Sequence, residues 1–158
     1  MVAFTNGHAD SGVFEAMAEF VEHRDHNGLY LVRINIENPA LYNRYMSMLT
    51  GKSTVKESDL SDYRSMHIKD VPYDALDRYS RTEDNAIAVT KEGFVMDDHR
   101  IGRFSIPEFV CEEARSGAGH IAMATLSLFP GVATYVCSAE KATVKKFRHG
   151  KIDKKYQK

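Results

Sequence analysis

Three segments of the 158-residue chain carry residue types that could bind a nucleotide or a metal ion. Ser116-Gly-Ala-Gly-His120 comes directly before a helical pattern, and its glycines would let the backbone approach a phosphate closely. Asp84-Asn-Ala86 precedes a predicted strand, where an aspartate can offer oxygen to a divalent metal ion. Ser138-Ala-Glu140 follows another predicted strand, and open α/β sheets place ligand sites at such ends.

Each of these segments also has a simpler interpretation. Taken alone, the glycine segment is an ordinary turn before a helix, and it matches neither a Walker loop nor a complete Gly-x-Gly-x-x-Gly motif. Asp84 is equally a turn residue, and Glu140 a loop residue that faces solvent. A single histidine such as His120 is more often structural than catalytic. The residues therefore point to a site only in combination.

Alternating helical and strand patterns predict the elements that must position these segments. The helical patterns cover residues 12–23, 39–50, 73–79 and 120–129. The strand patterns cover residues 29–36, 86–89, 94–96, 132–137 and 143–147. The predicted fold class is a single α/β domain with a mixed, twisted central sheet and helices on both faces. Strands 29–36, 86–89 and 132–137 have the densest apolar runs, so we expect them at its centre.

Composition and charge restrict the class of protein. Hydrophobic residues make up 43% of the chain and charged residues 27%, which is typical of a globular domain. Residues 141–158 hold eight Lys and Arg against one Asp. We expect residues 1–150 to form one folded domain and residues 151–158 a basic, flexible tail. The two cysteines, Cys111 and Cys137, are too few for a disulfide scaffold and are most simply buried apolar residues.

The same composition bears on partners and location. No apolar run is long enough to span a bilayer, and no signal peptide is visible, so we expect a cytoplasmic protein without a membrane partner. Aromatic residues do not alternate with the basic ones in any pattern typical of RNA binding. A nucleic-acid partner is therefore not expected.

In their order along the chain, the segments resemble the diadenylate cyclase (DAC) domain, the catalytic domain of DisA-type and archaeal c-di-AMP synthases. Asp84-Asn-Ala86 resembles the Asp-Gly-Ala motif of that family, and Gly117-Ala-Gly-His-Ile-Ala-Met-Ala124 resembles its Gly-x-Arg-His-x-Ala-Ala motif. Tyr135-Val-Cys-Ser-Ala-Glu140 resembles its Val-Ser-Glu-Glu strand end. The first strand and the closing hairpin resemble the family as well, so the ordered blocks cover residues 13–151. The resemblance thus implies that residues 1–150 form a DAC-like nucleotide-binding domain.

This resemblance implies a nucleotidyltransferase that condenses two ATP molecules into c-di-AMP and pyrophosphate between the subunits of a homodimer or higher homo-oligomer. Asp84 and His120 would be catalytic, and Asp84 and Glu140 would hold Mg²⁺ or Mn²⁺. The nucleotide and phosphate contacts would come from Asn85, Ala86, Ser116, Gly117, Ala118, Gly119, His120 and Ser138.

Two departures from the family's motifs leave the function open between an enzyme and a binding module. Asn85 stands where the family has glycine, and Gly119 stands where it has the arginine of the Arg-His pair. Loss of this arginine removes a bidentate phosphate donor, which Arg115 is a candidate to replace. The alternative to a cyclase is a degenerate DAC-fold module that binds or sequesters a nucleotide, or that serves as an interaction or regulatory protein.

Overall fold

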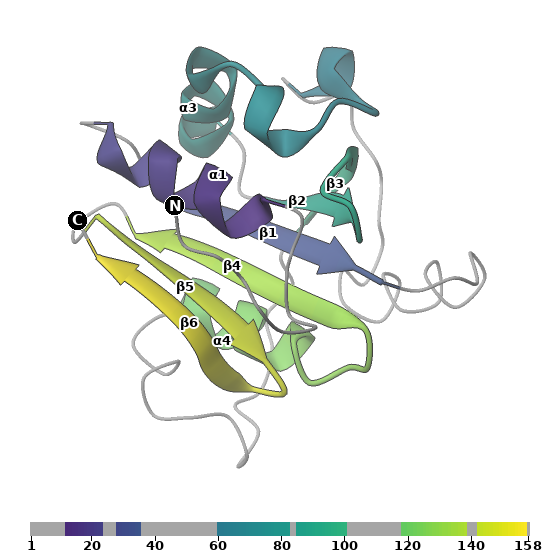
Figure 1. The fold of residues 1–158 in the computed structure, drawn as a ribbon, viewed down its shortest axis with the longest axis vertical. Helices are drawn as coiled ribbons and strands as arrows, with labels where there is room; N and C mark the ends of the chain where they lie inside the picture. The colour runs from purple at the N-terminus through teal and green to yellow at the C-terminus, as the bar shows by residue number, and fades with distance from the viewer. Residues whose placement is uncertain are drawn as a thin grey trace.

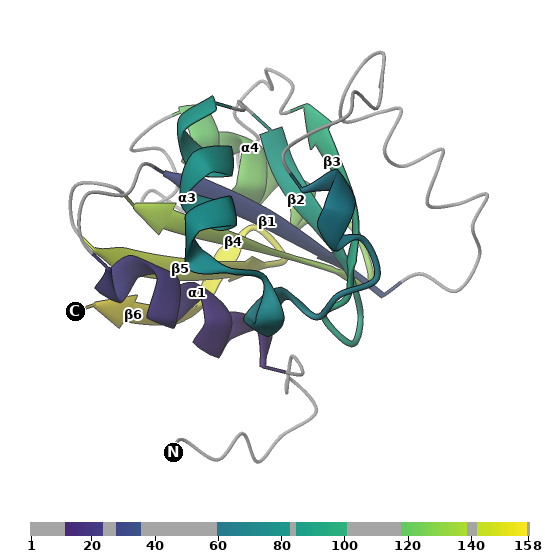
Figure 2. The same cartoon turned by 90° about the horizontal axis from the view of Figure 1, so that it is seen from above.

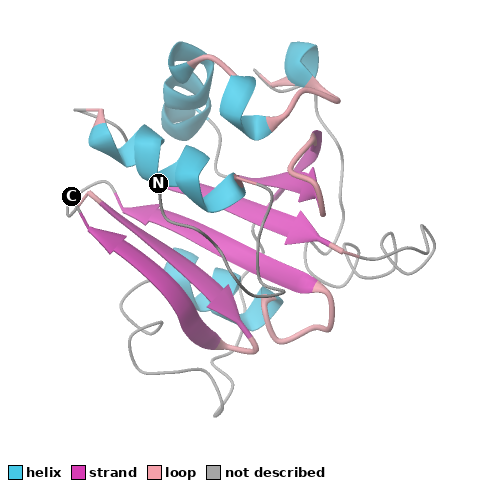
Figure 3. Cartoon of the chain, in the orientation of Figure 1, coloured by secondary structure: helices cyan, strands magenta, loops and turns pink. Residues whose placement is uncertain are grey.

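Six strands form one mixed sheet, in the order β3-β2-β1-β4-β5-β6. A computed structural model describes residues 12–23, 28–35, 60–82, 85–100, 118–138 and 142–157. The strands are β1 (Leu29–Ile34), β2 (Asn85–Thr90), β3 (Val95–Arg100), β4 (Val132–Ser138), β5 (Thr143–Arg148) and β6 (Lys151–Gln157). The helices are α1 (Val13–Glu22), α3 (Tyr73–Thr82), α4 (Ala118–Leu126) and the short 3-10 turns η1 (Ser61–Tyr63) and η2 (Ile68–Asp70). Strands β1 and β2 are parallel, and the other neighbours are antiparallel (Figure 1, Figure 3).

Helices cover both faces of this sheet, and each face has its own hydrophobic core. Figure 1 shows α1 in front of the sheet and α4 behind it. Leu31 and Tyr135 are buried with α1, α3 and η2, whereas Val32 and Phe147 are buried with α4. Successive residues of a strand point to opposite faces, so a strand covered on both sides must be apolar at nearly every position. This requirement explains the run Leu29-Tyr-Leu-Val in β1.

The structure confirms the predicted fold class. The three strands expected at the centre correspond to β1, β2 and β4, and each of them is paired on both sides. The predicted helix over residues 39–50 lies outside the described residues. No helix in the described part of the chain is both long and apolar enough to cross a membrane.

The prediction of a flexible tail is wrong for residues 151–157, which form the edge strand β6. Its connection to β5 is a two-residue turn, in which His149 and Gly150 have φ values of 54° and 78°. Positive φ at both turn positions is typical of a tight β-hairpin whose twist matches the strands. Exposed and half-buried residues alternate along β6. Its pairing with β5 shifts by one residue between Lys146 and Phe147, so Ile152 packs against the core beneath α4 and Tyr156 against the core beneath α1. The many lysines of this segment led to the prediction of a solvated tail. Charged residues are nevertheless common on edge strands, because they oppose aggregation.

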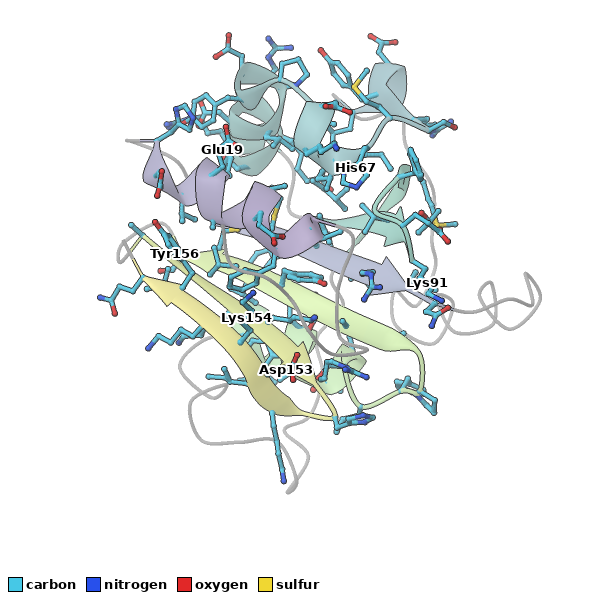
Figure 4. The ribbon with its side chains drawn as sticks, viewed as in Figure 1. Glu19, His67, Lys91, Asp153, Lys154 and Tyr156 are labelled. Carbon is cyan, nitrogen blue, oxygen red and sulfur yellow. The ribbon has the colours of Figure 1, made fainter. Side chains whose placement is uncertain are left out.

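Side chains of β6 attach it to α1. The Tyr156 hydroxyl donates a hydrogen bond to the Glu22 carboxylate, and this bond raises the pKa of Tyr156. The Lys154 ammonium lies 4.4 Å from the centre of the Phe14 ring, a distance suited to a cation–π contact (Figure 4). The domain therefore extends through Gln157.

A buried lysine joins the last three strands beneath α1. Lys146 of β5 has a side chain that is only 2% exposed, and its Nζ lies 3.6 Å from an Asp153 carboxylate oxygen. The same Nζ lies 5.8 Å from the centre of the Tyr135 ring of β4. A buried charge needs such partners, because an unpaired one would lose its hydration without compensation.

Gly93 gives a direct test of the packing between the β2–β3 turn and α1. Its φ is +94°, and a Cβ atom there would lie 2.6 Å from His67 Nε2 and 3.0 Å from Val13 Cγ2. The left-handed conformation alone costs an alanine about 1–2 kcal/mol, and the clash adds to that cost. We therefore expect Gly93→Ala to lower the free energy of unfolding, measured by urea denaturation, by about 2 kcal/mol or more.

Gly28→Ala is the matched control. A Cβ at Gly28 would meet its nearest atom, the Cys137 carbonyl oxygen, at 3.5 Å, which is ordinary van der Waals contact. This variant should change the free energy of unfolding by no more than about 0.5 kcal/mol. Equal stability of the two variants would contradict the described turn.

Candidate functional site

The register of β1 brings the start of β2 and the end of β4 to the same end of the sheet. Tyr30 pairs with Ala86 in parallel, and Leu29 pairs with Cys137 in antiparallel register. The first residue of β2 and the last residue of β4 therefore flank the start of β1. Neighbouring strands lie about 4.8 Å apart, so the backbones of β2 and β4 are about 10 Å apart here. We call this region, with Asn85, Gly28, Ser138 and Thr143, the Ser138 end of the sheet.

Helix α4 is attached to the opposite end of the sheet by Ser127, the residue that directly follows it. The His149 amide donates to the Ser127 carbonyl oxygen over 2.8 Å, and the Gly150 amide donates to the Ser127 hydroxyl over 3.0 Å. In the middle of the helix, the Thr134 hydroxyl donates to the Met123 carbonyl oxygen over 2.6 Å. The helix therefore begins, at Ala118, on the side away from the β5–β6 turn and toward the Ser138 end (Figure 1).

The described site residues fall on these three element ends. Asn85 opens β2, Ser138 closes β4, and Ala118, Gly119 and His120 form the first turn of α4. This arrangement leaves the backbone amides at the start of α4 without partners inside the helix itself, and such amides can bind an anion.

Several predicted site residues lie outside the described part of the chain: Asp84, Ser116, Gly117 and Glu140. The predicted metal ligands are among them, so the metal site stays a prediction. Ala86 is described and is only 3% exposed, within the core beneath α4. Its methyl group is therefore committed to packing, and only its backbone could serve a ligand.

His120 has a packing contact of its own. The side chain is half-buried, and its ring lies 6.5 Å from the Phe147 ring in an edge-to-face arrangement with an interplanar angle of 89°. Phe147 is fully buried in the core beneath α4. His120 thus has a structural contact, and its catalytic role stays a prediction.

A pocket on the other face of the sheet was not expected from the sequence. Its lining residues come from α1, η2, α3 and the residues next to them, which lie on this face of the sheet (Figure 2). Two of these residues, His23 and Tyr73, stack with their ring centres 4.0 Å apart. The pocket is lined by Ala16, Glu19, Phe20, His23, Ile68, Lys69, Val71, Tyr73 and Leu76. These residues belong to elements that cover the face opposite α4, so this pocket is not the predicted nucleotide site.

Neither a metal cluster nor a reactive thiol is found in the part of the chain that the structure describes. Within those residues, no group of three or more His, Cys, Asp or Glu side chains could hold a metal ion. Cys137 is 1% exposed, and its sulfur lies 3.7 Å from that of Met17. Burial raises the pKa of the Cys137 thiol far above its usual range, which confirms the expectation that this residue is an apolar part of the core.

Comparison with known proteins supports the fold. No protein-family model and no curated protein matches the chain. A double-cysteine variant of DacA from Staphylococcus aureus is 15% identical, with a TM-score of 0.54 over 89% of this chain and 81% of that one. A hypothetical membrane spanning protein from Bacillus cereus is 17% identical, with a TM-score of 0.58 over 92% of this chain. The match spans only 62% of the length of that second protein.

At these identities, the likeness concerns the fold alone. The chain has a fold like that of DacA, in agreement with the DAC-like architecture that the sequence resembles.

The buried thiol gives a test of this core. In a Cys111→Ser variant at pH 8, iodoacetamide should leave Cys137 unmodified in the folded protein, because the raised pKa and the burial both suppress the reactive thiolate. The same reagent should modify it fully in denaturant, as mass spectrometry would show. Rapid alkylation without denaturant would contradict the position of β4 beneath α1.

Proposed function

We propose that this chain is a nucleotide-binding protein of DAC-like fold, with ATP or c-di-AMP bound at the Ser138 end of the sheet. The observation that carries the proposal is that the start of β2 and the end of β4 flank the start of β1, at the end of the sheet toward which α4 begins (Figure 1). These are the ends at which the DAC-like motifs lie in the sequence. The likeness of the fold to that of DacA supports the DAC-like fold in this proposal, independently of those motifs.

The residues at these ends suit a nucleoside triphosphate. Backbone amides of Ala118 and Gly119 would donate to phosphate oxygens, favoured by the dipole of α4. The Ser138 hydroxyl would donate to a phosphate from the end of β4, and His120 would contribute a further contact from the first turn of α4. All these donors come from regular elements, which hold their positions before the ligand arrives.

A divalent metal ion fits the chemistry of the residues next to these ends. Asp84 directly precedes β2, and Glu140 lies two residues beyond the end of β4. Carboxylate oxygens are suitable ligands for Mg²⁺ and Mn²⁺, so Asp84 and Glu140 would hold either ion. When bound, the ion would neutralise charge that develops on the phosphate oxygens.

In the active version of the proposal, the protein is a diadenylate cyclase. The 3′-hydroxyl oxygen of one ATP forms a bond to the α-phosphorus of a second ATP, the hydroxyl loses its proton to solvent, and pyrophosphate leaves. A second such step closes the ring of c-di-AMP. Two copies of the chain would bring their nucleotides face to face, because each copy provides one site. Asp84 and His120 would be the catalytic residues.

The alternative version is a module that has kept nucleotide binding and lost catalysis. It is favoured by Asn85 and Gly119, which replace the glycine and the arginine of the DAC motifs. An arginine that pairs with phosphate through two parallel hydrogen bonds stabilises developing charge more than a backbone amide alone. Such a module would sense or sequester a nucleotide, or act as a regulatory partner.

Product analysis separates the two versions. The protein is incubated with ATP and Mn²⁺ or Mg²⁺, c-di-AMP and pyrophosphate are sought by chromatography, and binding is measured by calorimetry. Formation of both products identifies a cyclase, and binding without products identifies the degenerate module. Absence of both binding and products would contradict the proposal.

Asp84→Asn tests the predicted metal ligand, with Asp98→Asn as its matched control. Asp98 lies in β3, opposite Ile87, where the DAC motifs assign no role. Both variants remove one carboxylate charge, so their difference reports the position of the charge. We expect Asp84→Asn to weaken metal-dependent ATP binding or turnover about tenfold or more, and Asp98→Asn to leave both unchanged. Equal losses in the two variants would show that Asp84 is not a ligand.

A further inference from the structure

Two lysines lie opposite each other on β5 and β6, on the face of the sheet that α4 covers. Lys145 pairs with Lys155 across these strands, and on its other side Lys145 pairs with Val136 of β4. Val136 belongs to the core beneath α4. Residues directly paired in an antiparallel sheet point to the same face, so both lysines share the face of Val136.

The two neighbouring lysines of the hairpin point the other way. Lys146 is buried beside Asp153 and Tyr135, and Lys154 lies over the Phe14 ring of α1. These contacts hold the hairpin to the rest of the domain, so Lys146 and Lys154 have a structural function. Lys145 is half-buried and Lys155 is exposed, on the opposite face.

The position of Lys145 places it close to the Ser138 end of the sheet. Ser138 pairs with Thr143, so Lys145 is the diagonal neighbour of Ser138 on the same face. Diagonal neighbours lie about 7–8 Å apart, within reach of a long side chain. Lys155 is one strand further, about 5 Å beyond Lys145. A ligand at Ser138 is therefore within reach of the Lys145 side chain, with Lys155 on the next strand of the same face.

Two ammonium groups on the same face of neighbouring strands attract an anion more strongly than one ammonium group does. A polyphosphate has several charged oxygens that can contact both ammonium groups at once. Gly119 carries no charged side chain, so positive charge at the proposed phosphate site would come from other residues.

We propose that Lys145 and Lys155 form a polyphosphate-binding pair, which supplies the positive charge missing at Gly119 to the phosphates of a nucleoside triphosphate. This inference rests on the proposed nucleotide-binding function and names the residues that give it phosphate affinity. The pair adds a point charge on each of two strands, whereas the arginine would have added one planar donor on α4.

The experiment measures the affinity of four probes by calorimetry: ATP with Mg²⁺, c-di-AMP, inorganic tripolyphosphate, and adenosine. The variants are Lys145→Gln, Lys155→Gln and Lys145→Arg. The matched control is Lys151→Gln, an exposed lysine at the turn end of β6, opposite Arg148. Thermal unfolding of each variant shows whether it folds like the wild type, and the exposed position of Lys155 keeps that variant usable if Lys145→Gln is unstable.

We expect each glutamine variant at Lys145 and Lys155 to bind ATP and tripolyphosphate about tenfold more weakly. Adenosine affinity should stay the same, because adenosine carries no phosphate. Lys145→Arg should bind ATP nearly as well as the wild type, and Lys151→Gln should do so as well. Added salt should weaken ATP binding more in the wild type than in the glutamine variants.

The outcomes separate this inference from the proposed function. If ATP binds equally well to the wild type and to both glutamine variants, the lysine pair is overturned while nucleotide binding stands. If tripolyphosphate binds in a lysine-dependent way but ATP and c-di-AMP do not bind, the pair is supported and the nucleotide function fails. If none of these phosphate compounds binds to the wild type, both are overturned.

Discussion

The pairing of β1 with β2 and β4 determines which parts of the chain meet. Strand β1 is parallel to one neighbour and antiparallel to the other, so the start of β2 and the end of β4 flank its own start. A shift of one residue in either register would turn the buried side chains of β1 toward the wrong core. Both faces of β1 are buried, which fixes the register, and the fixed register brings Asn85 and Ser138 to one end of the sheet.

Burial of both faces also decides where a ligand could bind. Helices α1 and α3 cover one face and α4 covers the other, so the central strands have apolar side chains in two closed cores. Polar groups that could bind phosphate are therefore found where elements end, at the first turn of α4 and the last residue of β4. The hairpin of β5 and β6 extends the sheet beyond β4. Its lysines hold it to α1 on one face and adjoin the Ser138 end on the other.

Local sequence patterns were sufficient for most of the fold. Dense apolar runs predicted β1, β2 and β4 because a strand covered on both faces must be apolar at nearly every position. The same reasoning failed for β6, where lysines occupy an edge strand and the two apolar residues, Ile152 and Tyr156, pack on opposite faces of the sheet because the pairing with β5 shifts by one residue. The pairing of Lys145 with Lys155 could not be predicted from the sequence, because β6 was not predicted as a strand and the register between two strands depends on their packing in the fold. The roles of Asp84 and Glu140 came from resemblance alone, since a carboxylate beside a strand is common in any protein.

The central claim is that an adenine nucleotide binds at the end of the sheet where β2 begins and β4 ends. Titration of the ¹⁵N-labelled protein with ATP and Mg²⁺, followed by amide chemical shifts, tests it most directly. We predict shifts concentrated at Asn85, Gly119, Ser138 and Lys145, which come from four different elements and adjoin that end. Shifts confined to the pocket between α1, η2 and α3, or no shifts at saturating ATP, would contradict the claim.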